Sequence, residues 1–358
     1  MISLARLQSL LAAFPGLSIG LVGDLFLDRY LDIDPDLRET SVETGLEAYQ
    51  VTRVRNSPGA LGTVMNNLAA LGVGRLIPVT VIGDDGPGYD LLKELNRLPV
   101  DAAHVLRDAD RLTPTYTKPM RSDERGAWRE LNRLDLRNKA ALSQATQRRV
   151  LESLSEVFRA TDGLIVLDQV NEAEWGVVGA AVRGHLEKLV ESEPGKLIFV
   201  DSRAHIGAFH CGVLKPNRAE CLAAVGATES GIEMDNVSAA SLRLSAQTGQ
   251  PLFCTLGEQG ILVVRPDHPP ALVPAVAVCG PIDIVGAGDS ATAGIVASLL
   301  AGANEVEAAQ IGNLVASVTI GQIGTTGVAS PEQLKTRWQV AQQSKRGRRY
   351  LSRRDDRH

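Results

Sequence analysis

The chain has 358 residues and a formal net charge of -5, which lacks the basic balance typical of nucleic-acid-binding domains. Apolar residues make up 44% and aromatic residues only 4%, so we expect one sizeable core built from aliphatic side chains. No apolar run approaches the roughly 20 residues of a membrane helix, and the four cysteines are scattered. These features predict a cytoplasmic protein with reduced thiols and no membrane or nucleic-acid partner.

In chain order, apolar side chains at helical spacing in the first 16 residues predict an amphipathic helix rather than a signal peptide. Beyond them, short β-branched runs alternate with longer helical patterns. Strands are predicted over 17–23, 76–83, 163–168, 196–201, 212–216 and 251–257. Helices are predicted near 59–72, 86–97, 139–160, 172–190, 217–225, 234–247, 286–301 and 304–321. This alternation predicts an α/β fold with a mostly parallel central sheet and ligands beyond the carboxyl ends of its strands.

Three segments depart from this rhythm. Residues 28–55 and 113–135 are polar and rich in Thr, Tyr and Arg, which suits a small β lid over the active site. We expect 1–340 to form a single domain. Residues 341–358 are basic and predict a disordered tail, with a nucleic-acid-binding arm as the alternative.

The most informative segment is 281–302, where an extended stretch leads into the turn Gly286-Ala287-Gly288-Asp289 and then a helix of small residues. Glycines expose backbone N–H groups at a helix N-terminus, which is suited to an anion. A carboxylate there would repel the anion, but it could take a proton from a hydroxyl that attacks a phosphate. Asp289 is therefore a candidate general base, and a simple helix cap is the alternative. The sequence contains neither a Walker A loop nor a G-x-G-x-x-G turn after a strand.

This D-I-V-G-A-G-D-S run resembles the C-terminal signature of the PfkB, or ribokinase-like, carbohydrate kinases. Further segments resemble that family in order and spacing: Gly23-Asp24 with Asp28, the small-residue segment 57–72 followed by 79–88, N-x-x-E at 217–220, and T-x-G-x-x-G at 255–260. The resemblance covers about residues 17–335. It implies a ribokinase-like three-layer fold with a β lid, and transfer of the ATP γ-phosphoryl group to a sugar hydroxyl.

The resemblance also implies a role for each motif. Asp289 would be the base, and the amides of residues 286–288 would form an anion hole for the γ-phosphoryl group. The implied nucleotide and metal contacts are Asn217 and Glu220 for Mg²⁺ through water, Thr255, Gly257, Gly260 and Asn313 for ATP, and Asp283 for K⁺. The alternatives are a capping box for Asn217 and Glu220, a plain β-turn for the loop with Gly257 and Gly260, and a helix-surface residue for Asn313.

The implied substrate contacts are Asp24, Asp28, Gly59, Thr63, Lys118 and Arg133. Within the family, 22–34 and 115–139 look most like the kinase domain of the bifunctional heptose-7-phosphate kinase/adenylyltransferase. Ala60 and Thr63 stand where that family usually has Gly and Asn, which leaves the sugar open. A kinase for another ketose or nucleoside, or a catalytically idle sugar or nucleotide sensor, is the alternative. The resemblance also implies a homodimer formed through the lid.

Overall fold

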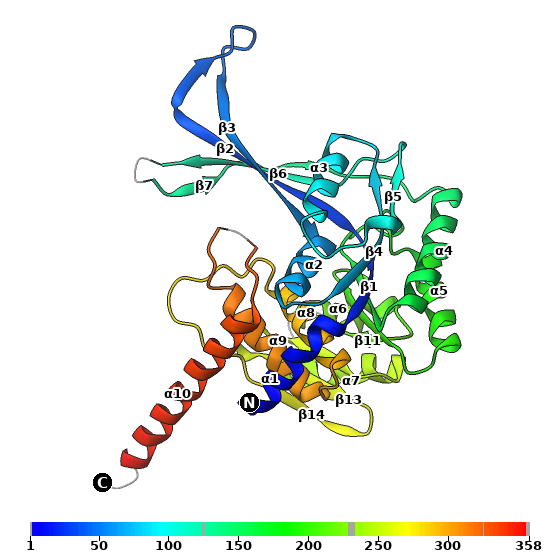
Figure 1. Cartoon of the computed structure of the whole chain (residues 1–358), viewed down its shortest axis with the longest axis vertical. Helices are drawn as coiled ribbons and strands as arrows, with labels where there is room; N and C mark the ends of the chain where they lie inside the picture. The colour runs from blue at the N-terminus through cyan, green and yellow to red at the C-terminus, as the bar shows by residue number, and fades with distance from the viewer. Residues whose placement is uncertain (1, 124–125, 228–232, 325, 356–358) are drawn as a thin grey trace.

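A computed structural model describes residues 2–123, 126–227, 233–324 and 326–355, with side chains described as far as residue 343. A central sheet forms the body (Figure 1), and in the described residues its order is β14-β13-β12-β11-β10-β9-β1-β4-β5. Its strands are β1 (Ser18–Gly23), β4 (Arg75–Gly83), β5 (Val105–Asp108), β9 (Gly163–Asp168), β10 (Leu197–Ser202), β11 (Val213–Leu214), β12 (Leu252–Thr255), β13 (Ile261–Arg265) and β14 (His268–Val273). Pairing is parallel from β12 through β5 and antiparallel for β12–β13 and β13–β14. The predicted fold class is confirmed.

The central strands are buried on both faces, so their apolar runs are continuous rather than alternating. Successive side chains still point to opposite faces. In β9, Ile165 and Leu167 belong to one core cluster, whereas Leu164 and Val166 belong to a second. The sheet therefore separates two cores, and each needs its own layer of helices.

Helices supply those layers. On the face of the first core lie α1 (Leu4–Ala13), α2 (Leu61–Ala70), α3 (Gly86–Leu95), α8 (Ala287–Leu300), α9 (Glu305–Thr319) and the start of α10 (Pro331–Asp355). On the face of the second lie α4 (Gln144–Ala160), α5 (Ala180–Ser192), α6 (Arg218–Ala224) and α7 (Met234–Thr248). In the part of the chain that is described, no helix is both long and apolar enough to cross a bilayer.

A second sheet projects from the body (Figure 1) and corresponds to the predicted lid. It comprises β2 (Leu25–Thr40), β3 (Glu47–Ala60), β6 (Thr115–Ser122), β7 (Trp128–Glu130) and β8 (Leu134–Leu136). Strand β2 begins two residues after β1 ends, and β3 leads directly into α2. Both ends of the long β2–β3 hairpin are therefore connected directly to the body. The hairpin extends beyond the predicted bounds of 28–55 at both ends.

Residues 281–285, predicted as an extended stretch before the turn, lie in a loop outside the described strands, where Ile282, Ile284 and Val285 are exposed. The structure differs from the sequence prediction at two helices. Helix α5 begins only at Ala180, and the preceding segment is a turn. Helix α10 continues to Asp355 through the segment predicted to be a disordered tail. Its Gln, Lys and Arg residues are good helix formers, so a helix already started on the body can be extended.

Candidate active site

The sequence motifs meet at one edge of the central sheet. Strands β1, β11 and β12 all run in the same direction, because the pairs that connect them across the sheet are parallel. Gly23-Asp24 lies at the carboxyl end of β1, the N-x-x-E motif follows β11, and the T-x-G-x-x-G motif lies at the end of β12. A backbone bridge joins Asn217 to Thr255, so the two predicted nucleotide loops lie side by side. The first turn of α8 completes this edge, since α8 packs against β10 and α2. Ligands of α/β sheets bind at such an edge.

The N-terminus of α8 has the geometry of an anion hole. Gly286 precedes the helix with φ +78°, a conformation that favours glycine, and no side chain caps the helix. The amide of Ala287 donates to the carbonyl of Ile284 at 3.1 Å. In the described residues the N–H groups of Gly286, Gly288 and Asp289 donate no hydrogen bond, so two of the predicted trio, Gly286 and Gly288, are free for an anion together with the amide of Asp289.

Asp289 lies in that first turn and is half-buried. Desolvation, followed by the negative charge of Asp201, raises the pKa of Asp289 to about 7. Lys215 and Arg203 oppose the rise, whereas Asp28 of the lid adds to it. A carboxyl group with such a pKa can accept a proton near neutral pH and release it again, as a general base must.

The root of the lid brings a second carboxylate toward this turn. Asp28 lies on β2, and its Oδ1 pairs with the Lys118 ammonium of β6 at 3.0 Å. A Cβ placed on Gly59 would lie 2.4 Å from Asp28 Oδ2, so the glycine makes room for that carboxylate. Thr63 also approaches the turn, with its methyl group 3.4 Å from the position of a Cβ on Gly286. Three of the predicted substrate residues, Asp28, Gly59 and Thr63, therefore border the space above α8.

Asp24 has different surroundings. Its carboxylate is buried and accepts backbone N–H groups from Gln169 at 2.9 Å, Val170 at 3.2 Å and Val177 at 2.8 Å. Burial raises its pKa, and these hydrogen bonds oppose the rise. Asp24 thus holds the segment after β9 against β1, and Asp28 is the carboxylate of this motif that faces the space above α8.

Asn217 and Glu220 form the capping box that was the alternative interpretation. Asn217 Oδ1 accepts the Glu220 amide at 2.9 Å, and Glu220 Oε2 accepts the Asn217 amide at 2.7 Å. Desolvation raises the pKa of Glu220. Among the described residues, Glu220 Oε1 accepts no hydrogen bond, and no cluster of three metal-ligating side chains is formed. One available carboxylate oxygen fits Mg²⁺ that keeps most of its water ligands.

The predicted nucleotide loop depends on two glycines. Gly257 has φ +60° and open space around it, whereas Gly260 has φ +103° and a Cβ there would lie 2.1 Å from the Val273 carbonyl oxygen. Asn313 donates its side-chain amide to the carbonyls of Val273, at 3.0 Å, and Pro274, at 3.2 Å. Asn313 therefore supports the strand behind the loop, and its amide N–H groups already have partners.

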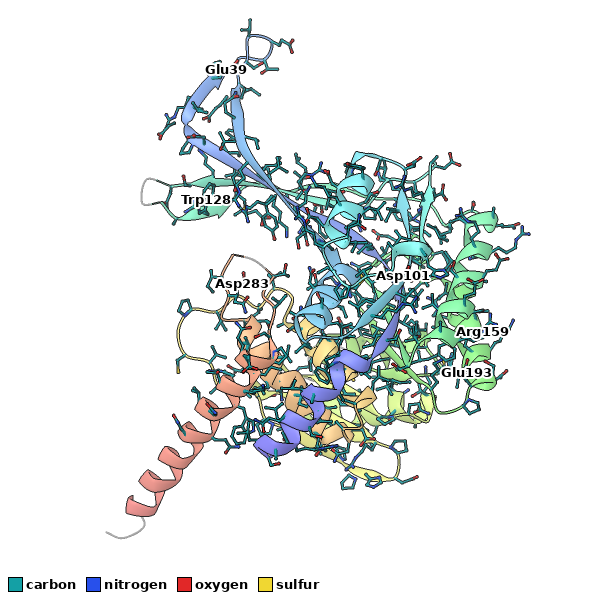
Figure 2. All side chains as sticks on the ribbon, viewed as in Figure 1. Glu39, Asp101, Trp128, Arg159, Glu193 and Asp283 are labelled. Carbon is teal, nitrogen blue, oxygen red and sulfur yellow. The ribbon has the colours of Figure 1, made fainter. Side chains whose placement is uncertain are left out.

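The remaining predicted residues lie in the lid and in the loop before α8. Arg133 pairs with Asp135 at 2.7 Å and lies over the Tyr116 ring, 4.1 Å from its centroid. Asp283 accepts the Val285 amide at 3.0 Å. Figure 2 shows Asp283 on the side of the body from which the lid projects.

Sequence reasoning missed three charged residues of this site. Asp201 ends the apolar run of β10, Arg203 follows it, and Lys215 follows β11. Arg203 is exposed and acts electrostatically on Asp289, Glu220 and the lid residue Tyr116. The available signal was position: charged residues directly after buried strands lie at the ligand-binding edge of an α/β sheet.

Solved structures define the fold class. The ribokinase of Arabidopsis thaliana, complexed with ribose and ATP, superposes with a TM-score of 0.66 at 16% identity, covering 90% of this chain and 98% of that one. The phosphofructokinase-2 of Escherichia coli, in complex with potassium, gives 0.67 at 19% identity, covering 91% and 99%. The fold is ribokinase-like.

Sequence comparison then gives the family. The model of the pfkB family carbohydrate kinases matches residues 27–333, so the chain belongs to that family. The bifunctional protein HldE of Pelobacter propionicus is 30% identical over 315 residues, covering 87% of this chain and 61% of that protein. HldE of a Caulobacter species is 28% identical over 328 residues, covering 91% and 64%. The chain spans less than two thirds of the length of these relatives.

Proposed function

We propose that this chain is a sugar or sugar-phosphate kinase that transfers the γ-phosphoryl group of ATP to a substrate hydroxyl. The observation that carries the proposal is the start of α8, where free backbone amides adjoin a carboxyl group whose pKa is raised to about 7. The amides suit the charge that builds on the transferred group, and Asp289 suits the proton released by the attacking hydroxyl. Membership of the pfkB family supports the same reaction.

In this mechanism the substrate hydroxyl lies between Asp289 and the γ-phosphorus. Asp289 takes the hydroxyl proton as the new oxygen–phosphorus bond forms and the bond to the β,γ-bridging oxygen breaks. Asp28 would bind other hydroxyls of the acceptor, while Glu220 and Asn217 would orient Mg²⁺ through water. The turn containing Thr255, Gly257 and Gly260 would hold the ATP phosphates. K⁺ beside Asp283 is part of the proposal and is supported by the potassium complex of the phosphofructokinase-2 relative.

The acceptor is proposed only as a class. The resemblance of 22–34 and 115–139 to the heptose-7-phosphate kinase branch favours a heptose 7-phosphate. The two cations among the implied substrate contacts, however, already have carboxylate partners, Lys118 with Asp28 and Arg133 with Asp135. Because these ion pairs leave a substrate phosphate without an obvious cation, the acceptors tested should include each sugar with and without its phosphate. ADP release from Mg-ATP would be measured with heptose 7-phosphate, fructose phosphates, hexoses, ribose and nucleosides.

One acceptor should support turnover that falls at least about 10²-fold in Asp289→Asn, while ATP affinity stays near that of the wild type. Full turnover in Asp289→Asn would refute the base assignment. ATP binding with no turnover of any acceptor would favour a sensor.

We also propose that the lid forms a homodimer. Its strands expose large apolar side chains that a monomer would leave in water: Tyr49, Val51, Val54, Trp128 and Leu134. Light scattering of wild type and Val54→Asp tests this, because a charge in a buried strand interface should shift the protein toward monomer. An unchanged mass would exclude this surface.

A further inference from the structure

The mechanism proposed above leaves one buried lysine without a role. Lys215 follows β11, its side chain is only 4% exposed, and its Nζ lies 2.8 Å from Oδ2 of Asp201, which is 9% exposed. Moving an ammonium and a carboxylate out of water is costly, and a buried pair is often no more stabilising than apolar residues of the same volume. Stability alone therefore does not explain this pair.

The Asp201 carboxylate gives the buried Lys215 ammonium an opposite charge at 2.8 Å. Asp201 is itself fixed by a second donor, the Thr292 hydroxyl of α8, at 2.9 Å. The ion pair is thus attached to the same helix whose first turn carries the free amides.

The position of Gly288 links the lysine to the anion hole. A Cβ placed on Gly288 would lie 3.8 Å from Lys215 Nζ. Apart from its chain neighbours and the backbone of its own helix, no other atom of the described residues would lie within 4 Å of that Cβ. The φ of Gly288 is not positive, so its conformation does not require glycine. What the glycine provides is open space beside the Lys215 ammonium, next to the free amides of Gly288 and Asp289.

We propose that Lys215 is a catalytic residue whose ammonium forms one wall of the anion hole and binds the γ-phosphoryl group during transfer, with Asp201 as its positioning residue. This inference rests on the proposed kinase function. Lys215 keeps its protons throughout: the hydroxyl proton passes to Asp289, and the electron pair of the broken bond leaves with ADP. Its contribution is electrostatic, and the burial of the lysine side chain strengthens it.

A set of charge variants separates this role from a structural one. Lys215→Met leaves Asp201 buried without its cationic partner and should lower the midpoint of urea denaturation clearly below that of the wild type. The double variant Lys215→Met/Asp201→Asn removes both charges and should recover most of that stability. If Lys215 acts on the phosphoryl group, kcat of the double variant stays at least about 10²-fold below wild type despite its recovered stability. Recovery of wild-type kcat along with stability would overturn the proposal.

Asp201→Asn alone keeps the cation and should lose less activity than either variant that lacks Lys215. A matched control is Lys196→Met, which removes a half-buried lysine paired with Glu193 at the opposite edge of the sheet. It tests whether loss of any partly buried lysine lowers kcat.

A binding measurement needs no sugar acceptor. Titration calorimetry would compare Mg-ADP with the Mg complex of β,γ-methylene ATP on wild type, the double variant and Lys196→Met. The double variant should bind ADP as the wild type does but lose about tenfold or more in affinity for the analogue. Equal affinities of wild type and double variant for the analogue would overturn the inference even if Asp289→Asn abolishes turnover. Loss of analogue binding would support it even if no acceptor in the panel is phosphorylated.

Discussion

Replacing Asp289 with Asn should make the protein more stable at alkaline pH while removing its activity. Desolvation and the Asp201 charge raise the pKa of Asp289 in the folded protein to about 7, against 3.8 in an exposed chain. A carboxyl group whose pKa is raised in the folded protein favours folding while it is protonated. The stability that protonated Asp289 contributes is therefore complete below about pH 4 and is lost as the pH rises through 7. The asparagine side chain resembles the protonated acid and does not titrate.

The magnitude follows from the shift. About three pKa units at 1.36 kcal/mol each give a cost of about 4 kcal/mol for the ionised form. The cost is close to its full value at pH 8 but only about 2 kcal/mol at pH 5, since Asp289 is still mostly protonated in the folded protein at that pH. The stability gained by Asp289→Asn should therefore be about 2 kcal/mol larger at pH 8 than at pH 5.

Urea denaturation of wild type and variant at both pH values measures this difference, with Asp36→Asn on the exposed β2–β3 hairpin as the control. A gain that does not depend on pH would refute the electrostatic reasoning. In the wild type, kcat/KM for the acceptor should also rise with pH to a plateau above about 7, because the base must be ionised.

Three further predictions concern fixed positions of the site. Asp24→Ala leaves one buried and two partly buried amides without an acceptor and should cost about 3 kcal/mol in unfolding free energy, measured by denaturation. A change below about 1 kcal/mol would contradict the role of Asp24 in fixing the backbone of 169–177. Gly59→Ala would place a methyl group 2.4 Å from Asp28 Oδ2 and should raise KM for the acceptor at least about tenfold, with KM for ATP unchanged. If steady-state kinetics show both KM values changing together, Asp28 does not act on the substrate. Gly260→Ala would bring a methyl group 2.1 Å from the Val273 carbonyl oxygen, so we expect a fall of several degrees in Tm and weaker ADP binding by calorimetry. A variant with normal Tm and normal ADP affinity would show that the loop can move.

The turn at 286–289 could be predicted from the sequence because its chemistry is local. Glycine at positive φ, free amides and an adjacent carboxyl group all lie within four residues. The same holds for the alternation of buried strands and helices, which follows from hydrophobic periodicity and predicted the three-layer fold. The family resemblance added the roles of these residues.

Other features depended on contacts between distant segments. Nothing local distinguishes Asp24 from Asp28, yet tertiary structure surrounds one with backbone amides from 169–177 and places the other opposite Lys118 of a different strand. Whether the extended stretch 281–285 joins the sheet also depends on distant strands, and among the described residues no strand pairs with it.

The Lys215–Asp201 pair illustrates the same limit for the site itself. The two residues are fourteen positions apart, and their charges meet only because β10 and β11 are adjacent and parallel. Sequence alone determined the strands, the turn and the candidate base of this protein, since these depend on neighbours along the chain. Which charges surround that base, and therefore its pKa, was decided by the order of the strands in the folded sheet.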